Sequence, residues 1–324
     1  MKKINKGIRI PLVCLSFLLI LAILLLTVSY IFAPKGYWES FGQGRIFVDN
    51  AVLDEPENSL DVLFLGDSLV YSSVSPLEIW SNYGFTSFVC AAPAQQISYC
   101  EALLREVLEK QKPKAVVFEP NALYRKKKTI SAIDARFEAL FCVFNYHDDW
   151  KKVDKSYFSG YFNVDSANDF KGFLLSKKTK KGKTSKYMKE TDRSKAFPDF
   201  NEEYFKSIVD ICKEAGTELI VASVPSRKCW DYEKHNGVQA LSEKYGVEYI
   251  DLNLLSGDIP IDWQTDTRDK GDHLNYSGAL KISKFFGEYL KNNYSLSDRR
   301  GDDDYAPWNE ALEKYLNYVK ASNK

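Results

Sequence analysis

The chain has 324 residues, of which 45% are hydrophobic, and its 44 Lys and Arg residues balance 44 Asp and Glu residues. This balance leaves no overall positive field, so we expect no nucleic-acid partner. A chain of this length can bury a full hydrophobic core without disulfide bonds or a structural metal ion. Its six cysteines show no regular spacing and no C-x-x-C pair, so the sequence predicts neither a disulfide framework nor a metal site, and no cofactor.

The N-terminus predicts a membrane anchor. Residues 10–34 carry no charge, and at about 1.5 Å per residue they would span roughly 37 Å, more than the ~30 Å hydrocarbon core of a bilayer. A cleaved signal peptide is the alternative, but its apolar region is normally only about 7–15 residues long. We therefore expect a single-pass membrane protein anchored in the lipid bilayer. Residues 1–9 should be cytoplasmic and the rest extracytoplasmic, because basic residues precede the anchor: Lys2, Lys3, Lys6 and Arg9.

After a predicted juxtamembrane linker (residues 35–60), short apolar runs alternate with stretches of helical period. Continuous apolar strands that alternate with helices indicate a parallel sheet covered on both faces. Residues 61–293 therefore predict a doubly wound, flavodoxin-like α/β three-layer sandwich with about five parallel strands. The expected strands are 61–66, 85–91, 114–119, 217–224 and 247–251, and the expected helices are 97–111, 202–215 and 235–245.

Two regions exceed this five-stranded unit. Residues 122–200 form a long insertion, within which residues 177–189 hold seven lysines. We call residues 177–189 the lysine-rich segment. Its charge pattern fits a solvated, mobile loop, or alternatively a contact for an anionic envelope polymer or lipid headgroups. The tail, residues 294–324, predicts a helix that packs as an appendage.

The first chemical candidate is Ser68. It ends Gly66-Asp67-Ser68, which directly follows the first predicted strand. Ligands of open α/β sheets lie beyond the carboxyl ends of the strands, so a sharp turn there would expose a hydroxyl. A purely structural reading is that Asp67 or Ser68 caps the next helix.

A serine nucleophile needs a base, and the chain has three histidines. His235 lies among polar residues at a predicted helix start and suggests a surface position. His147 lies in the insertion. His273 alone follows the last predicted strand in a loop that holds several carboxylates, which favours it as the base.

At this point the sequence resembles the SGNH/GDSL hydrolases over residues 60–293. Gly66-Asp67-Ser68 is similar to their nucleophile block, and residues 116–121 (Val-Val-Phe-Glu-Pro-Asn) resemble the block that ends in an oxyanion-hole asparagine. Residues 269–273 resemble the terminal acid–histidine block. With the preceding anchor and the trailing aromatic tail, the chain resembles the membrane-anchored bacterial branch related to the D-alanine transfer protein of lipoteichoic acid.

The resemblance implies roles for individual residues. Ser68 would be the nucleophile and His273 the base. The backbone N–H groups of Ser68 and Ala91, with the side-chain amide of Asn121, would form the oxyanion hole. Ala91 stands where the family usually has glycine, which is tolerable if its φ stays negative.

The acid of the terminal block is left open between two residues. The family usually has its aspartate three positions before the histidine, where this chain has Lys270. Asp269 or Asp272 must serve instead, and Asp269 is favoured because a residue adjacent to His273 in an extended loop tends to point away. His147, flanked by Asp148 and Asp149, is the rival base.

The function that these features imply is an extracytoplasmic, serine-dependent O-acyltransferase or esterase. It would act on a cell-envelope glycan or teichoic-type polymer, with a membrane-bound O-acyltransferase as a partner that supplies the acyl group. A non-catalytic accessory protein that binds the polymer or that partner is the alternative from another class. A soluble secreted lipase is a third, which predicts release from the membrane.

Overall fold

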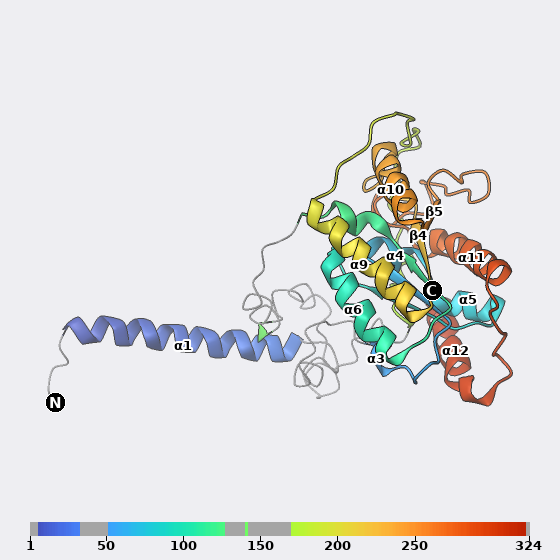
Figure 1. The fold of residues 1–324 in the computed structure, drawn as a ribbon. Helices are drawn as coiled ribbons and strands as arrows, with labels where there is room; N and C mark the ends of the chain where they lie inside the picture. The colour runs from blue at the N-terminus through green and yellow to red at the C-terminus, as the bar shows by residue number, and fades with distance from the viewer. Residues whose placement is uncertain (1–5, 33–50, 127–139, 142–169, 322–324) are drawn as a thin grey trace. The chain divides into compact units, whose positions relative to one another are not determined.

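The computed structural model describes residues 6–32, 51–126, 140–141 and 170–321. It divides into two compact units, residues 1–50 with 128–166, and residues 51–127 with 167–324. In the first unit, helix α1 (Lys6–Phe32) contains Ile10–Ile31, which is long and apolar enough to cross a membrane (Figure 1). This helix is consistent with single-pass anchoring.

The second unit is built on a sheet of five parallel strands in the order β2-β1-β3-β4-β5. The predicted α/β class and strand number are confirmed. In this order β1 lies between β2 and β3, so the chain changes direction across the sheet at the carboxyl end of β1. The strands are β1 (Val62–Gly66), β2 (Ser87–Ala91), β3 (Ala115–Phe118), β4 (Glu218–Ser223) and β5 (Glu248–Asp251).

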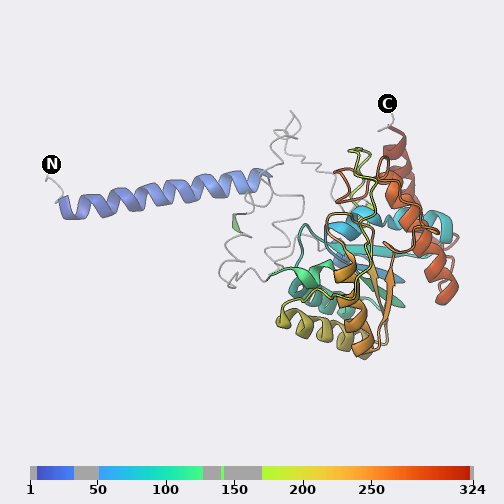
Figure 2. The same ribbon diagram turned by 90° about the horizontal axis from the view of Figure 1, so that it is seen from above.

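Helices cover both faces of the sheet (Figures 1 and 2). Alternate residues of each strand point to opposite faces, so Leu63 and Leu65 of β1 enter one core and Val62 and Phe64 enter the other. The first core lies under α6 (Ile97–Lys110), α9 (Asp199–Ala215) and α10 (Tyr232–Tyr245), and the second lies under α4 (Ser68–Ser73). Helices α5 (Pro76–Tyr83) and α11 (Tyr276–Asn293) contribute residues to both cores.

Both ends of the second unit extend beyond the predicted sandwich. The short helix α3 (Ala51–Asp54) lies in the segment predicted as a linker, yet Val52 is completely buried in the core. The tail forms η5 (Asp303–Tyr305) and α12 (Ala306–Ala321), and the Trp308 ring packs 5.4 Å from the Trp80 ring of α5. Residues 51–60 and the tail are therefore parts of the compact unit.

The lysine-rich segment runs along the loop that precedes α11. The Lys180 N–H donates to the Thr267 carbonyl at 3.0 Å, and the Lys270 N–H donates back to the Lys180 carbonyl at 3.0 Å. The Gly182 N–H donates to the Trp263 carbonyl at 2.7 Å. These backbone bonds connect the segment to the neighbouring loop. Six of its lysines remain exposed: Lys178, Lys180, Lys181, Lys183, Lys186 and Lys189.

Candidate active site

The turn after β1 places Ser68 at the switch point of the sheet. A Cβ at Gly66 would lie 2.7 Å from the Cβ of Glu119 on the neighbouring β3, so only glycine fits where the chain leaves the sheet. Asp67 then caps α4, with its Oδ1 accepting from the Leu69 N–H at 2.9 Å. The capping predicted for this turn is present, and it belongs to Asp67, while Ser68 stays partly exposed beyond the strand end.

Ser68, His273 and Asp269 form a continuous hydrogen-bonded chain. The Nε2 of His273 lies 2.8 Å from the Ser68 Oγ, and its Nδ1 lies 2.6 Å from the Asp269 Oδ2. A carboxylate can only accept, so the proton of the neutral ring belongs on Nδ1, and Nε2 accepts from the serine hydroxyl. This is the arrangement that a serine nucleophile and its general base require.

Asp269 also holds the backbone beside the imidazole. Its Oδ1 accepts the N–H of His273 at 2.7 Å and that of Asp272 at 3.1 Å. Burial works against the ionised carboxylate, but the hydrogen bonds from the backbone and ring of His273, with the nearby Arg268 guanidinium, outweigh it and lower the pKa of Asp269. Asp269 therefore stays ionised opposite the imidazole at neutral pH.

A tight turn between the two residues makes this possible. Lys270 and Gly271 both take positive φ, 72° and 94°, so the chain reverses and returns over Asp269. The Thr267 hydroxyl donates to the His273 carbonyl at 2.9 Å and accepts the Gly271 N–H at 2.8 Å. These bonds fix the loop from which the imidazole projects.

Asp272 does not contact the His273 ring. Its Oδ1 accepts from the Cys229 Sγ at 3.0 Å, and its Oδ2 lies 4.0 Å from the Lys228 Nζ. Of the two aspartates left open by the sequence, Asp269 is the one that contacts the His273 ring. Asp269, Asp272 and His273 also offer ligand atoms within 4.8 Å of one another, but a metal ion there would have to displace the hydrogen bond between Asp269 and His273.

The proposed oxyanion donors lie at the ends of the adjacent strands. Ala91 ends β2 in register with Gly66 of β1, and its φ is not positive, so the alanine that the sequence places here adopts this position without backbone strain. Asn121 follows β3 in η1 (Pro120–Tyr124). Its side-chain Nδ2 donates to the Asp67 Oδ2 at 3.0 Å, while its Oδ1 accepts from the Lys234 Nζ at 3.0 Å.

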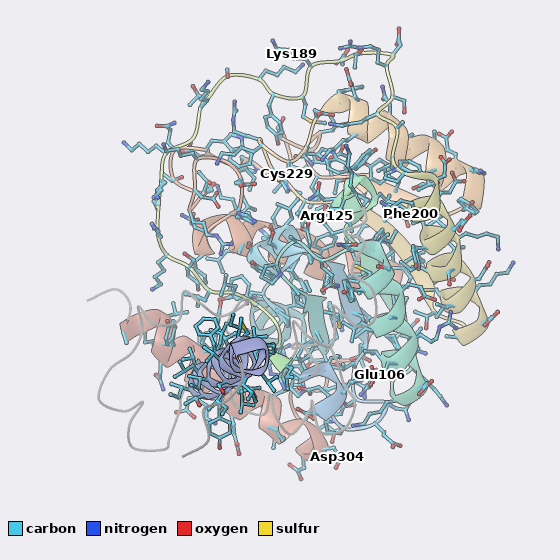
Figure 3. The ribbon with its side chains drawn as sticks, turned by 90° about the vertical axis from the view of Figure 1, so that its left-hand side faces the viewer. Glu106, Arg125, Lys189, Phe200, Cys229 and Asp304 are labelled. Atoms are coloured by element: carbon cyan, nitrogen blue, oxygen red, sulfur yellow. The ribbon has the colours of Figure 1, made fainter. Side chains whose placement is uncertain are left out.

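A polar network lies next to Ser68. Its members Asp67, Glu119, Asn121 and Lys234 are buried, and the fifth, Arg125, has 29% of its side chain exposed. Asp67 is completely buried, and its Oδ2 also accepts from Nε (3.0 Å) and Nη2 of Arg125. Burial, together with the charge of Asp67, raises the pKa of Glu119 well above its ordinary value. Arg125 lies toward the same end of the strands as Cys229 and the lysine-rich segment, which carries Lys189 (Figure 3). Sequence reasoning missed Arg125 and Lys234, which lie outside every recognisable motif.

The predicted surface position of His235 is wrong. Only 16% of its side chain is exposed, and its Nδ1 lies 2.9 Å from the Asp251 Oδ2. Asp251 ends β5 and also accepts from the Trp230 Nε1 at 3.0 Å. The first turn of α10 therefore packs against the end of the sheet. The rival base His147, with Asp148 and Asp149, lies outside the described residues.

No protein-family profile and no curated protein matches the sequence. Solved structures with a similar backbone include a GDSL-like lipase from Bacteroides thetaiotaomicron, at 12% identity, covering 80% of this chain and 98% of that one, with a TM-score of 0.39. A lipase/acylhydrolase from Enterococcus faecalis is 11% identical, and the match covers 74% of this chain and 98% of that one with a TM-score of 0.38. A psychrotrophic esterase from Pseudoalteromonas is 10% identical, and the match covers 71% of this chain and 96% of that one with a TM-score of 0.38. Identities and TM-scores this low do not assign a reaction to this chain, so its chemistry must be inferred from the positions of its own residues.

Proposed function

We propose that the chain is a membrane-anchored serine acyltransferase or esterase of the SGNH type. The single observation that carries this proposal is the hydrogen-bonded chain from Ser68 through His273 to Asp269. It spans 205 residues of sequence, and a structural role alone would not require a hydroxyl, an imidazole and a carboxylate in that order.

The reaction follows from these contacts. The Ser68 Oγ attacks the ester carbonyl as His273 Nε2 takes its proton, and a tetrahedral oxyanion forms. The carbon–oxygen bond to the leaving alcohol then breaks, and His273 returns the proton to that alcohol. Water or a sugar hydroxyl attacks the acyl-serine in the same way, which releases the acid or a new ester. The N–H groups of Ser68 and Ala91 and the amide of Asn121 stabilise the oxyanion.

The acceptor that we propose is an anionic cell-envelope polymer of the teichoic or glycan type. Helix α1 would keep the enzyme at the membrane, with the catalytic unit outside. The exposed lysines of the lysine-rich segment lie beside the loop that carries His273, and none of the described residues forms an ion pair with Lys178, Lys180 or Lys181. A positive surface so placed would concentrate an anionic chain near the nucleophile. A membrane-bound O-acyltransferase would supply the acyl group, as in the branch related to the D-alanine transfer protein.

A fluorophosphonate probe tests the nucleophile. The full-length protein in detergent should be labelled, and Ser68→Ala should abolish labelling. Ser73→Ala is the matched control, because Ser73 lies on the same helix but its hydroxyl donates to the Leu69 carbonyl at 2.7 Å. Labelling that survives Ser68→Ala would mean another nucleophile.

Two cellular experiments separate the alternatives. Complementation by Ser68→Ala would favour a non-catalytic accessory protein, whereas loss of complementation supports catalysis. Fractionation should leave the protein in the membrane pellet, since a soluble secreted lipase would be released into the medium.

A further inference from the structure

The amide of Asn121 is held at both ends by opposite charges. Its Nδ2 faces the carboxylate of Asp67 and its Oδ1 faces the ammonium group of Lys234, each at 3.0 Å. A flipped amide would place oxygen against the carboxylate and N–H against the ammonium, and both contacts would be repulsive. The two charges therefore fix which end of the amide lies on the side of Asp67, the residue next to Ser68.

Lys234 is placed for this contact by the fold. It lies in the first turn of α10, is 9% exposed, and donates from Nζ to the Cys229 carbonyl as well as to Asn121. The Tyr124 and Trp230 rings lie 4.9 and 5.5 Å from the ammonium group. An ammonium that is confined by two carbonyl oxygens and two aromatic faces has little freedom to leave Asn121.

The contact also changes the chemistry of the amide. A cation at the carbonyl oxygen draws electron density from the nitrogen, so hydrogen bonds that the N–H groups donate become stronger. Asp67 takes one of the two Nδ2 hydrogens, and the second has no acceptor among the described residues. That hydrogen is the one left for a developing oxyanion.

We propose that Lys234 is a positioning residue of the oxyanion hole, which acts through Asn121 by orienting and polarising its amide. This inference rests on the proposed function, because an oxyanion forms only if Ser68 attacks a carbonyl. It assigns a catalytic contribution to a residue 113 positions from Asn121, outside the three family blocks.

A double-mutant cycle tests it with p-nitrophenyl acetate hydrolysis by the full-length protein in detergent. Asn121→Ala should lower kcat by about 10²–10³, the usual cost of a lost oxyanion donor. Lys234→Met should lower kcat by about 10- to 100-fold with KM within about twofold, since it impairs the donor without removing it. In the Asn121→Ala background, Lys234→Met should cost nothing further, because its target is gone.

The controls distinguish failure of the role proposed for Lys234 from failure of the proposed function. Lys244→Met removes a lysine of the same helix whose side chain is 61% exposed and paired with Glu202, and it should leave kcat unchanged. Full multiplicative losses in the double mutant, or an unchanged kcat in Lys234→Met, would overturn the role of Lys234 while the proposed function stands. If near-ultraviolet circular dichroism shows that Lys234→Met is unfolded, Lys234→Gln enters the same cycle. Turnover that persists in Ser68→Ala would overturn the proposed function, and this inference with it.

Discussion

Replacing Asp269 with asparagine should cost about 10⁴ in kcat, because it reverses the tautomer of His273. The Asp269 Oδ1 accepts two backbone N–H groups, from Asp272 and His273, so the oxygen of an asparagine amide must occupy that place. Its NH₂ group then replaces Oδ2 and donates to Nδ1. The ring proton moves to Nε2, which faces the Ser68 Oγ at 2.8 Å and can no longer accept its proton.

Asp272→Asn is the matched control for this prediction. Asp272 lies three residues on in the same loop, but its carboxylate faces Cys229 and Lys228 and leaves the imidazole untouched. We expect its kcat to stay within about threefold of the wild type, since the tautomer of His273 is unchanged.

The assay is p-nitrophenyl acetate turnover, combined with the second-order rate of labelling by a fluorophosphonate probe. Both rates should fall together in Asp269→Asn, while near-ultraviolet circular dichroism shows an intact fold. Equal losses in the two variants, or a loss confined to Asp272→Asn, would refute the assignment of Asp269 and with it the tautomer argument.

Three further predictions concern stability, each measured on the full-length protein in detergent. Gly66→Ala should lower the free energy of unfolding by about 1–3 kcal/mol, because the new Cβ would lie 2.7 Å from that of Glu119; an unchanged Tm would contradict this crowding. Trp308→Ala should cost about 3–5 kcal/mol, since Trp308 is 3% exposed; a smaller effect would show that the tail is dispensable. The folded protein keeps the proton of Glu119, whose pKa burial raises, at pH values where the unfolded chain has released it. Stability should therefore fall as pH rises through that window, and Glu119→Gln should flatten this slope in urea unfolding.

The fold could be predicted because its strands are unbroken apolar runs. Every residue of β1, β2 and β3 is buried, and such runs are recognisable without any knowledge of their neighbours. The tail was harder to place. The sequence predicts its helix, but only the contacts of Trp308 and of the completely buried Tyr315 show that it closes the core.

Two residues of the candidate site, Ser68 and His273, could be predicted from the sequence because each lies next to a recognisable strand or helix. Ser68 follows the first strand and His273 precedes a helix, so both could be placed at the same edge. An extended loop would favour Asp269 by turning Asp272 away from the imidazole, whereas the positive φ angles of Lys270 and Gly271 make a turn. The favoured residue contacts the imidazole because the chain folds back onto it, which is a different reason from the one given by the sequence.

Lys234 and His235 show where sequence reasoning ends. Both sit in a polar run that is typical of an exposed helix start, and both side chains are largely enclosed. Their partners are Asn121, at the end of β3, and Asp251, at the end of β5. Nothing local in the sequence indicates contacts that only the assembled sheet creates.

The tail has a consequence for how the protein is made. The Tyr315 hydroxyl of α12 and the Tyr276 hydroxyl of α11 both donate to Glu78 Oε1, at 3.0 Å each. During synthesis Ser68 is therefore made 205 residues before His273, and the contact of Tyr315 with Glu78 can form only later still. Premature stop codons anywhere before residue 315 should yield incomplete products that quality-control proteases can recognise.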